Sequence, residues 1–167
     1  MYTASKAALA TLVLALVATA AVRAQGVNGS ISATATVQSP ITVTGAQNLG
    51  FGNVFPGVAK TVAYSDATNS GQFSVTGQAT TPVTYSFSLP TNLTSSGNNL
   101  PIGSWTGYLN TTNSTSGGSA ITPSATPAGG TLSASGALYL FVGATVTPPV
   151  NLPAGSYTGT VTLTVSY

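Results

Sequence analysis

Side chains that can do acid–base or nucleophilic chemistry are almost absent from this chain. Beyond residue 24 the only charged side chains are Lys60 and Asp66, and the whole sequence contains no histidine and no cysteine. General acid–base catalysis needs titratable groups held within reach of one another. Ser-His-Asp and Cys-His nucleophile systems need the residue types that are missing. The sequence therefore predicts a protein without catalytic residues.

The same inventory bears on metals and on charged partners. Zinc, copper and iron sites draw on Cys, His and several carboxylates, so we predict no metal site and no cofactor. Lys60 and Asp66 cancel, and a neutral chain lacks the electrostatic footprint for nucleic acid or anionic lipid. So little charge favours a surface that packs against copies of itself. We interpret the chain as a structural or binding protein.

The first 24 residues have the pattern of an export signal. Lys6 supplies a positive charge, residues 9–17 supply an apolar core, and residues 22–24 form a small-residue cleavage site. The apolar run, residues 7–22, is shorter than the roughly 20 residues that a membrane-spanning helix needs. We therefore expect a signal peptide over residues 1–24 and a mature chain without a membrane span. Such a protein is exported, in the periplasm during transit and then at the cell surface or outside the cell.

Alternation with a period of two dominates the chain after residue 40. From residue 157 the odd positions are mostly apolar and the even positions are Thr or Ser, which is typical of a strand with one buried face. Residues 138–142 are apolar on both faces and are expected in the centre of a sheet. With Gly and Pro turns at short intervals, seven or eight such strands predict an all-β fold, an antiparallel β-sandwich over residues 40–167. A closed barrel is the alternative.

A similar alternation occupies the N-terminal extension, residues 25–39. Its apolar or small positions are Val27, Gly29, Ile31, Ala33, Ala35 and Val37. Pro40 then interrupts the ladder, because proline has no amide donor. The pattern fits two interpretations equally well: a strand that pairs with another molecule, and the first strand of the chain's own sandwich.

Residues 91–130 differ in composition, being rich in Ser, Thr, Asn, Gly and Pro. We interpret them as a long decorated connection with one hairpin. Trp105 and Tyr108 form part of its apolar island, and neutral aromatic faces suit a neutral glycan. The alternative is that Trp105 belongs to the core, as a single Trp in a β-sandwich usually does.

Five blocks, taken in order, resemble a known family. They are residues 40–57 (PITVTGAQNLGFGNVFPG), 72–77 (QFSVTG), 85–90 (YSFSLP), 130–146 (GTLSASGALYLFVGATV) and 152–167 (LPAGSYTGTVTLTVSY). The chain resembles a family of small exported bacterial proteins of unassigned function. That family is similar in turn to fimbrial subunits of the spore coat protein U type, which are assembled by the chaperone–usher route. The resemblance implies an immunoglobulin-like sandwich that is incomplete and is completed by an N-terminal strand donated from another copy.

The resemblance also implies roles for particular residues. The donor strand would be residues 27–37. The acceptor groove would be flanked by the C-terminal strand, which a periplasmic chaperone would also grip, with its apolar face formed by Tyr157, Val161, Leu163, Val165 and Tyr167. Fimbrial subunits usually carry a disulfide cysteine where this chain has Ile41.

Two functions follow from these patterns. The first is a non-catalytic structural subunit of a bacterial surface fibre or coat, which polymerises by donor-strand complementation. Its partners would be copies of itself or related subunits, a periplasmic chaperone and an outer-membrane usher. The alternative is a self-complete secreted binding module, an adhesin that contacts neutral glycans through Trp105 and Tyr108.

Overall fold

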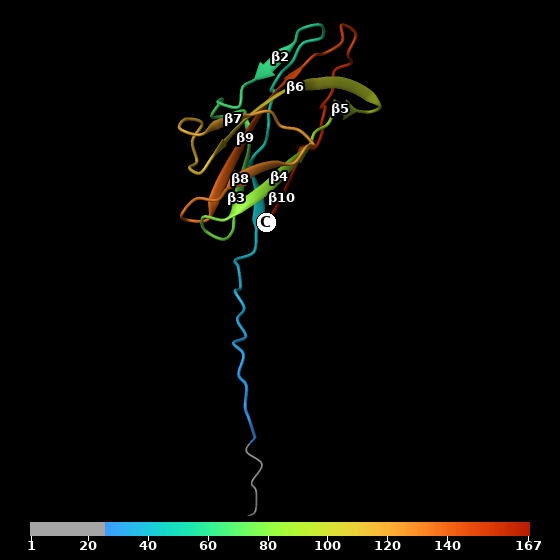
Figure 1. Cartoon of the computed structure of the whole chain (residues 1–167). Coiled ribbons are helices and arrows are strands. Elements are labelled where there is room, and N and C mark those ends of the chain that lie inside the picture. The colour runs from blue at the N-terminus through green and yellow to red at the C-terminus, as the bar shows by residue number, and fades with distance from the viewer. Residues whose placement is uncertain (1–25) are drawn as a thin grey trace, which may run out of the picture. The chain divides into compact units, whose positions relative to one another are not determined.

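The computed structural model describes residues 26–167, and the expected signal peptide, residues 1–24, lies outside the described residues. The chain falls into two units, Met1–Ala35 and Thr36–Tyr167. The described part of the first unit, residues 26–35, contains neither helix nor strand. All ten strands found in residues 26–167 belong to the second unit (Figure 1). Within residues 26–167 no helix is long and apolar enough to cross a membrane.

The second unit consists of two antiparallel sheets. The larger sheet follows the order β1 (Thr42–Gln47), β3 (Gly71–Thr76), β9 (Ala137–Val146), β6 (Asn98–Asn110) and β5 (Asn92–Ser95), with β2 (Lys60–Val62) paired to β9 and β7 (Ser119–Ile121) paired to β6. The smaller sheet follows the order β10 (Thr162–Ser166), β4 (Pro82–Ser88) and β8 (Ala128–Thr131). The prediction of an all-β, antiparallel sandwich is confirmed.

Strand β9 forms the centre of the larger sheet, between β3 and β6, as its sequence predicted. Successive side chains of a strand point to opposite faces. Leu138, Leu140 and Val142 face the space between the sheets and are at most 1% exposed. Phe141 lies on the other face of the strand and is also buried. Burial on both faces explains why this strand is apolar at every position from 138 to 142.

The core has two adjoining clusters. The first lies between the sheets, where the ring of Phe87 meets Phe73 and Tyr85 edge to face, each pair with centroids 6.2 Å apart. The second is built on Leu100, Ile102, Ala144 and Val146, with half-buried apolar side chains packed around it. Trp105 packs against both clusters and so joins them.

The interpretation of residues 91–130 as a connection with one hairpin is wrong. This segment contains β5, β6, β7 and the first residues of β8, and β6 is the longest strand of the fold. Leu100 and Ile102 of β6 are buried, so the segment supplies part of the core. The Thr and Ser residues that suggested a loop are compatible with a strand whose other face is exposed.

Candidate functional site

Each sheet ends on a strand with one unpaired edge, and these two edges are neighbours. Among the described residues β1 pairs only with β3, and β10 pairs only with β4. β1 and β10 approach each other. β1 begins and β10 ends at the same pole of the sandwich, so the two strands run in opposite directions (Figure 1). A row of unpaired main-chain groups on an edge strand is a template for a further strand.

A small hydrogen-bond network marks this pole, which we call the near pole and define by Ser39, Gln78 and Tyr167. The Tyr167 hydroxyl donates to the main-chain oxygen of Ser39 and accepts from the main-chain N–H of Gln78, at 2.7 Å. The N–H of Ser39 donates to Oε1 of Gln78, at 3.2 Å. The main chain entering β1 is therefore fixed to the end of β10.

Away from the near pole the two edges separate and leave a groove of about 800 Å³. One lip consists of residues 45–54, which form the end of β1 and the loop after it, and the other of residues 155–161, which precede β10. The floor is apolar and is formed by Phe73, Leu93, Leu100, Ile102 and Val142. Several lining side chains are only half-buried, so a segment that filled the groove would remove further apolar surface from water.

The first lip owes its shape to a turn and to one main-chain bond. Gly52 has a φ of 58°, in the left-handed region that glycine adopts without steric cost. The N–H of Gly50 donates to the carbonyl of Asn69 at 2.9 Å. Leu49, Phe51 and Val54 then pack against the second core cluster. The lip is thus anchored to the loop that contains Asp66.

Asp66 organises that loop by accepting hydrogen bonds. Its Oδ1 accepts from the N–H groups of Thr68 and Asn69, each at 2.9 Å, and its carboxylate also accepts from the Asn69 side-chain amide. These bonds, first of all that from the Asn69 side chain, lower the pKa of Asp66 below its ordinary value of 3.8. The second charged residue, Lys60, donates from Nζ to the carbonyl of Asn53 on the lip, at 3.1 Å. Both charged groups therefore support the first lip.

The second lip is extended but is not part of a ladder. Thr158 forms an isolated bridge with Thr94, through main-chain bonds of 2.8 and 3.1 Å. Gly159 leaves room for the Leu93 side chain, because a Cβ atom at this position would lie 2.7 Å from its Cδ2. Tyr157 donates from its hydroxyl to the Pro153 carbonyl at 2.9 Å. This bond fixes the turn that leads into the lip.

The structure distributes the predicted groove residues over three places. Tyr157 and Val161 line the groove. Leu163 is buried in the first core cluster, and Val165 packs against that cluster. Tyr167 lies at the near pole. The regular strand is shorter than the predicted one, because β10 covers only Thr162–Ser166.

The predicted donor residues lie in neither sheet. Val27 and Ile31 are 96% exposed and Val37 is 94% exposed. Gly29, Ala33 and Ala35 are exposed as well. The assignment of residues 27–37 as a donor strand, within or between chains, stays a prediction.

Sequence reasoning missed the first lip of the groove. Leu49, Phe51 and Val54 were given no role in the sequence analysis, although all three line the groove. The available signal was their apolar character, which is unusual so close to the turn at Gly52. Three half-buried apolar side chains in a loop indicate that the loop packs against the core and leaves apolar surface that can contact a further segment.

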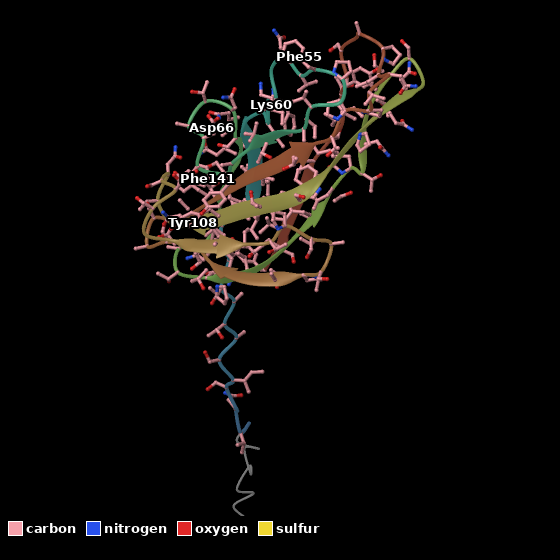
Figure 2. The ribbon with its side chains drawn as sticks, turned by 90° about the horizontal axis from the view of Figure 1, so that it is seen from above. Phe55, Lys60, Asp66, Tyr108 and Phe141 are labelled. Carbon is pink, nitrogen blue, oxygen red and sulfur yellow. The ribbon has the colours of Figure 1, made fainter. Side chains whose placement is uncertain are left out.

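The two aromatic residues of the glycan hypothesis have separate roles in the fold. Trp105 packs between the core clusters. Tyr108 stacks on Tyr64, with centroids 5.3 Å apart and ring planes 12° from parallel, and its hydroxyl accepts from the N–H of Gly118 at 2.7 Å. Figure 2 shows Tyr108 close to Phe141 and far from Phe55. Glycan contact through this pair stays a prediction.

A protein-family model, described as a domain of unknown function (DUF4402), matches residues 29–167. The chain belongs to this family. No curated protein matches the chain. The DUF4402 match begins within the N-terminal extension, so the family includes residues 29–39 together with the sandwich.

Proposed function

We propose that this DUF4402 protein is a non-catalytic structural subunit of a bacterial surface fibre or coat, related to fimbrial subunits of the spore coat protein U type. In the fibre, residues 27–37 of one copy pair between β1 and β10 of the next copy. The observation that carries the proposal is the groove with an apolar floor that lies between the end of β1 and the residues that precede β10, beside these two unpaired edges. A strand laid there would extend both sheets and cover the groove floor.

The donor segment is long enough to run the length of the sandwich, and its pattern suits the groove. Strand β9 has 10 residues and ends at the end of the sandwich away from the near pole. It spans about 33 Å at roughly 3.3 Å per residue. Residues 27–37, fully extended, have about the same length. Their apolar positions alternate with polar ones, so one face would cover the groove floor and the other would face solvent.

The energy of such a junction suits a lasting assembly. About eight main-chain hydrogen bonds would contribute roughly 0.5–1.5 kcal/mol each. Burial of Val27, Ile31 and Val37, which are now exposed, would add roughly 1.5–3 kcal/mol apiece. The gross total is on the order of 10–20 kcal/mol before the cost of ordering the strand, so the junction would rarely open.

The near pole favours pairing between chains over pairing within one chain. To fill its own groove, the extension would have to turn back at Ser39 and Pro40. Both main-chain groups of Ser39 are already engaged, its N–H by Gln78 and its carbonyl by Tyr167. A turn at this point would break both bonds.

Export and assembly partners belong to the same proposal. The protein would pass through the periplasm, where a chaperone would hold the unpaired edge of β10 until a neighbouring subunit replaced it, and an outer-membrane usher would receive it. An edge strand that exposes unpaired main-chain groups needs such cover, since it otherwise pairs with any available strand.

Deletion of residues 27–37, behind an intact signal, tests the proposal. We expect the wild type to form polymers in size-exclusion chromatography and the deleted variant to be monomeric. A synthetic peptide of residues 27–37 should bind the deleted variant and raise its melting temperature, whereas the same peptide carrying Ile31→Lys should not. A wild type that stays monomeric at high concentration, with a deleted variant that no longer folds or binds the peptide, would instead indicate a self-complete module.

A further inference from the structure

Three exposed apolar side chains gather at the end of the sandwich opposite to the near pole. Phe55 is 68% exposed, Val58 is 58% exposed and Val150 is 84% exposed. We call them the far-pole patch. Phe55 projects from an extremity of the body in Figure 2. Large apolar side chains grouped on a surface mark a site of interaction.

The far-pole patch is built from two loops that the fold holds together. Residues 53–59 begin at the end of the first lip of the groove, and residues 147–152 follow β9. The N–H of Gly57 donates to the carbonyl of Pro148 at 3.0 Å, and Gly57 has a φ of 78°. A Cβ atom at Gly57 would lie 3.2 Å from Cγ1 of Val150. The two loops are therefore closely packed and present the patch as one surface.

The patch is continuous with the groove. Asn53 and Val54 line the groove, and Phe55 is the next residue of the chain. A segment that fills the groove and leaves it at this end must pass beside the patch.

The direction of β10 decides which end of the donor leaves there. β10 runs toward the near pole, where Tyr167 lies. A donor strand antiparallel to β10 runs the other way, toward the far-pole patch, and is then parallel to β1. With the opposite polarity, the near pole of the donating copy would meet the near pole of the accepting copy. Residues 36–40 of each copy already occupy its own near pole.

The short connection then fixes the position of the donating copy. Only residues 38–40 separate Val37 from Ile41, and they span at most about 14 Å. The near pole of the donating copy must therefore lie against the end of the groove from which its strand emerges.

From this geometry we infer that the far-pole patch is the seat for the near pole of a second copy of this chain. The inference rests on the proposed function and adds to it the polarity of the fibre and a second contact at each junction. The two surfaces differ, so the contact is heterologous, and repetition of a heterologous contact gives an open filament. The near-pole loops bear no charged side chain, so no side-chain charge has to leave water when they are buried against apolar groups.

Engineered cysteines test this contact, because the chain has none of its own. Val150 lies in the patch, and Ala134 is exposed in the near-pole loop that Gly136 anchors to Gly77. Oxidised polymers of the Val150→Cys, Ala134→Cys double variant should give a ladder of covalent oligomers on a non-reducing gel. A matched control joins Ala134→Cys to Ala120→Cys, on the edge strand β7, and should give no ladder.

The outcomes separate this inference from the proposed function. A ladder from the first pair alone supports the seat. Polymers that give no ladder, or covalent dimers from the Val150→Cys single variant, overturn the seat and leave donor-strand assembly standing. A wild type that never polymerises overturns both. As a second measurement, Phe55→Ser should speed the release of subunits from preformed polymers by about tenfold to a hundredfold, and an unchanged rate would contradict the seat.

Discussion

The hydroxyl of Tyr167 is bonded to the main-chain oxygen of Ser39, which precedes it by 128 positions. The bond joins the end of the smaller sheet to the entrance of the larger one. The same hydroxyl accepts from the N–H of Gln78, so a single side chain holds three segments. This arrangement keeps the start of β1 in place while the residues before it remain outside both sheets.

Tyr167→Phe removes that hydroxyl and nothing else. We expect a loss of about 1 kcal/mol in the free energy of unfolding, because water can reach the freed groups beside a side chain that is 47% exposed. The melting temperature should fall by about 2–5 °C. Tyr139→Phe, on β9, is the control and should change it little. Equal losses in the two variants would show that the Tyr167 bonds contribute nothing specific.

Gly143→Ala should be far more damaging than its size suggests. A Cβ atom at Gly143 would lie 2.4 Å from the carbonyl oxygen of Val62 and 2.5 Å from the N–H nitrogen of Tyr64. Main-chain atoms cannot move aside as a flexible side chain can, so we expect a loss of about 3 kcal/mol or more in urea unfolding. Gly129→Ala, in β8, meets nothing within 4 Å and should stay within about 0.5 kcal/mol of wild type.

The sandwich could be predicted from the sequence because its most regular strands bury one or both faces completely. The apolar run at residues 138–142 predicted a central strand, and β9 is central. The alternation that ends at Tyr167 predicted a half-buried strand, and Leu163 is buried between exposed Thr162 and Thr164. Periodicity reports burial directly in such segments.

The long strand β6 could not be predicted in the same way. The register of β6 against β9 shifts between Gly103 and Thr106, and this irregularity interrupts the alternation. Periodicity alone also had no means to locate the groove. Its two lips come from residues 45–54 and 155–161, and only the packing of the two sheets brings these distant segments together. The C-terminal lip was predicted from the family resemblance, whereas Leu49, Phe51 and Val54 were not.

Acidification should reveal the role of Asp66. Its pKa is lower in the folded protein than its ordinary value of 3.8, so the folded state favours the ionised form. The stabilisation is therefore complete above about pH 5 and is lost as the pH falls through the folded-state pKa. We expect a melting temperature that is nearly flat from about pH 5 to 8 and that decreases below about pH 4.

Asp66→Asn isolates this contribution. The variant should melt lower than wild type at neutral pH, because its neutral amide oxygen accepts the Thr68 and Asn69 bonds less strongly. The difference between the two proteins should shrink as the pH falls below about 4. A difference that is constant from about pH 3 to 7 would show that ionisation of Asp66 has no part in holding the loop.

Ile31→Lys and Thr34→Lys give the sharpest test of the donor strand. Both residues are exposed in the described chain, so neither change should affect the folding of the sandwich. In a strand laid into the groove, Ile31 falls on the apolar face and Thr34 on the hydroxylic face. A lysine at position 31 would then have to be buried, at a cost of several kcal/mol, whereas a lysine at position 34 would stay in water.

The expected result is therefore a pair of variants with the same melting temperature as monomers and different assembly. Size-exclusion chromatography should find the Ile31→Lys protein monomeric or bound to its chaperone, and the Thr34→Lys protein polymeric like the wild type. Mixed with wild type, Ile31→Lys subunits should still accept a donated strand and so terminate polymers at one end. If Ile31→Lys instead lowers the melting temperature of a monomer sharply, the segment belongs to the chain's own sandwich, because only burial within one chain makes a charge at that position destabilise folding.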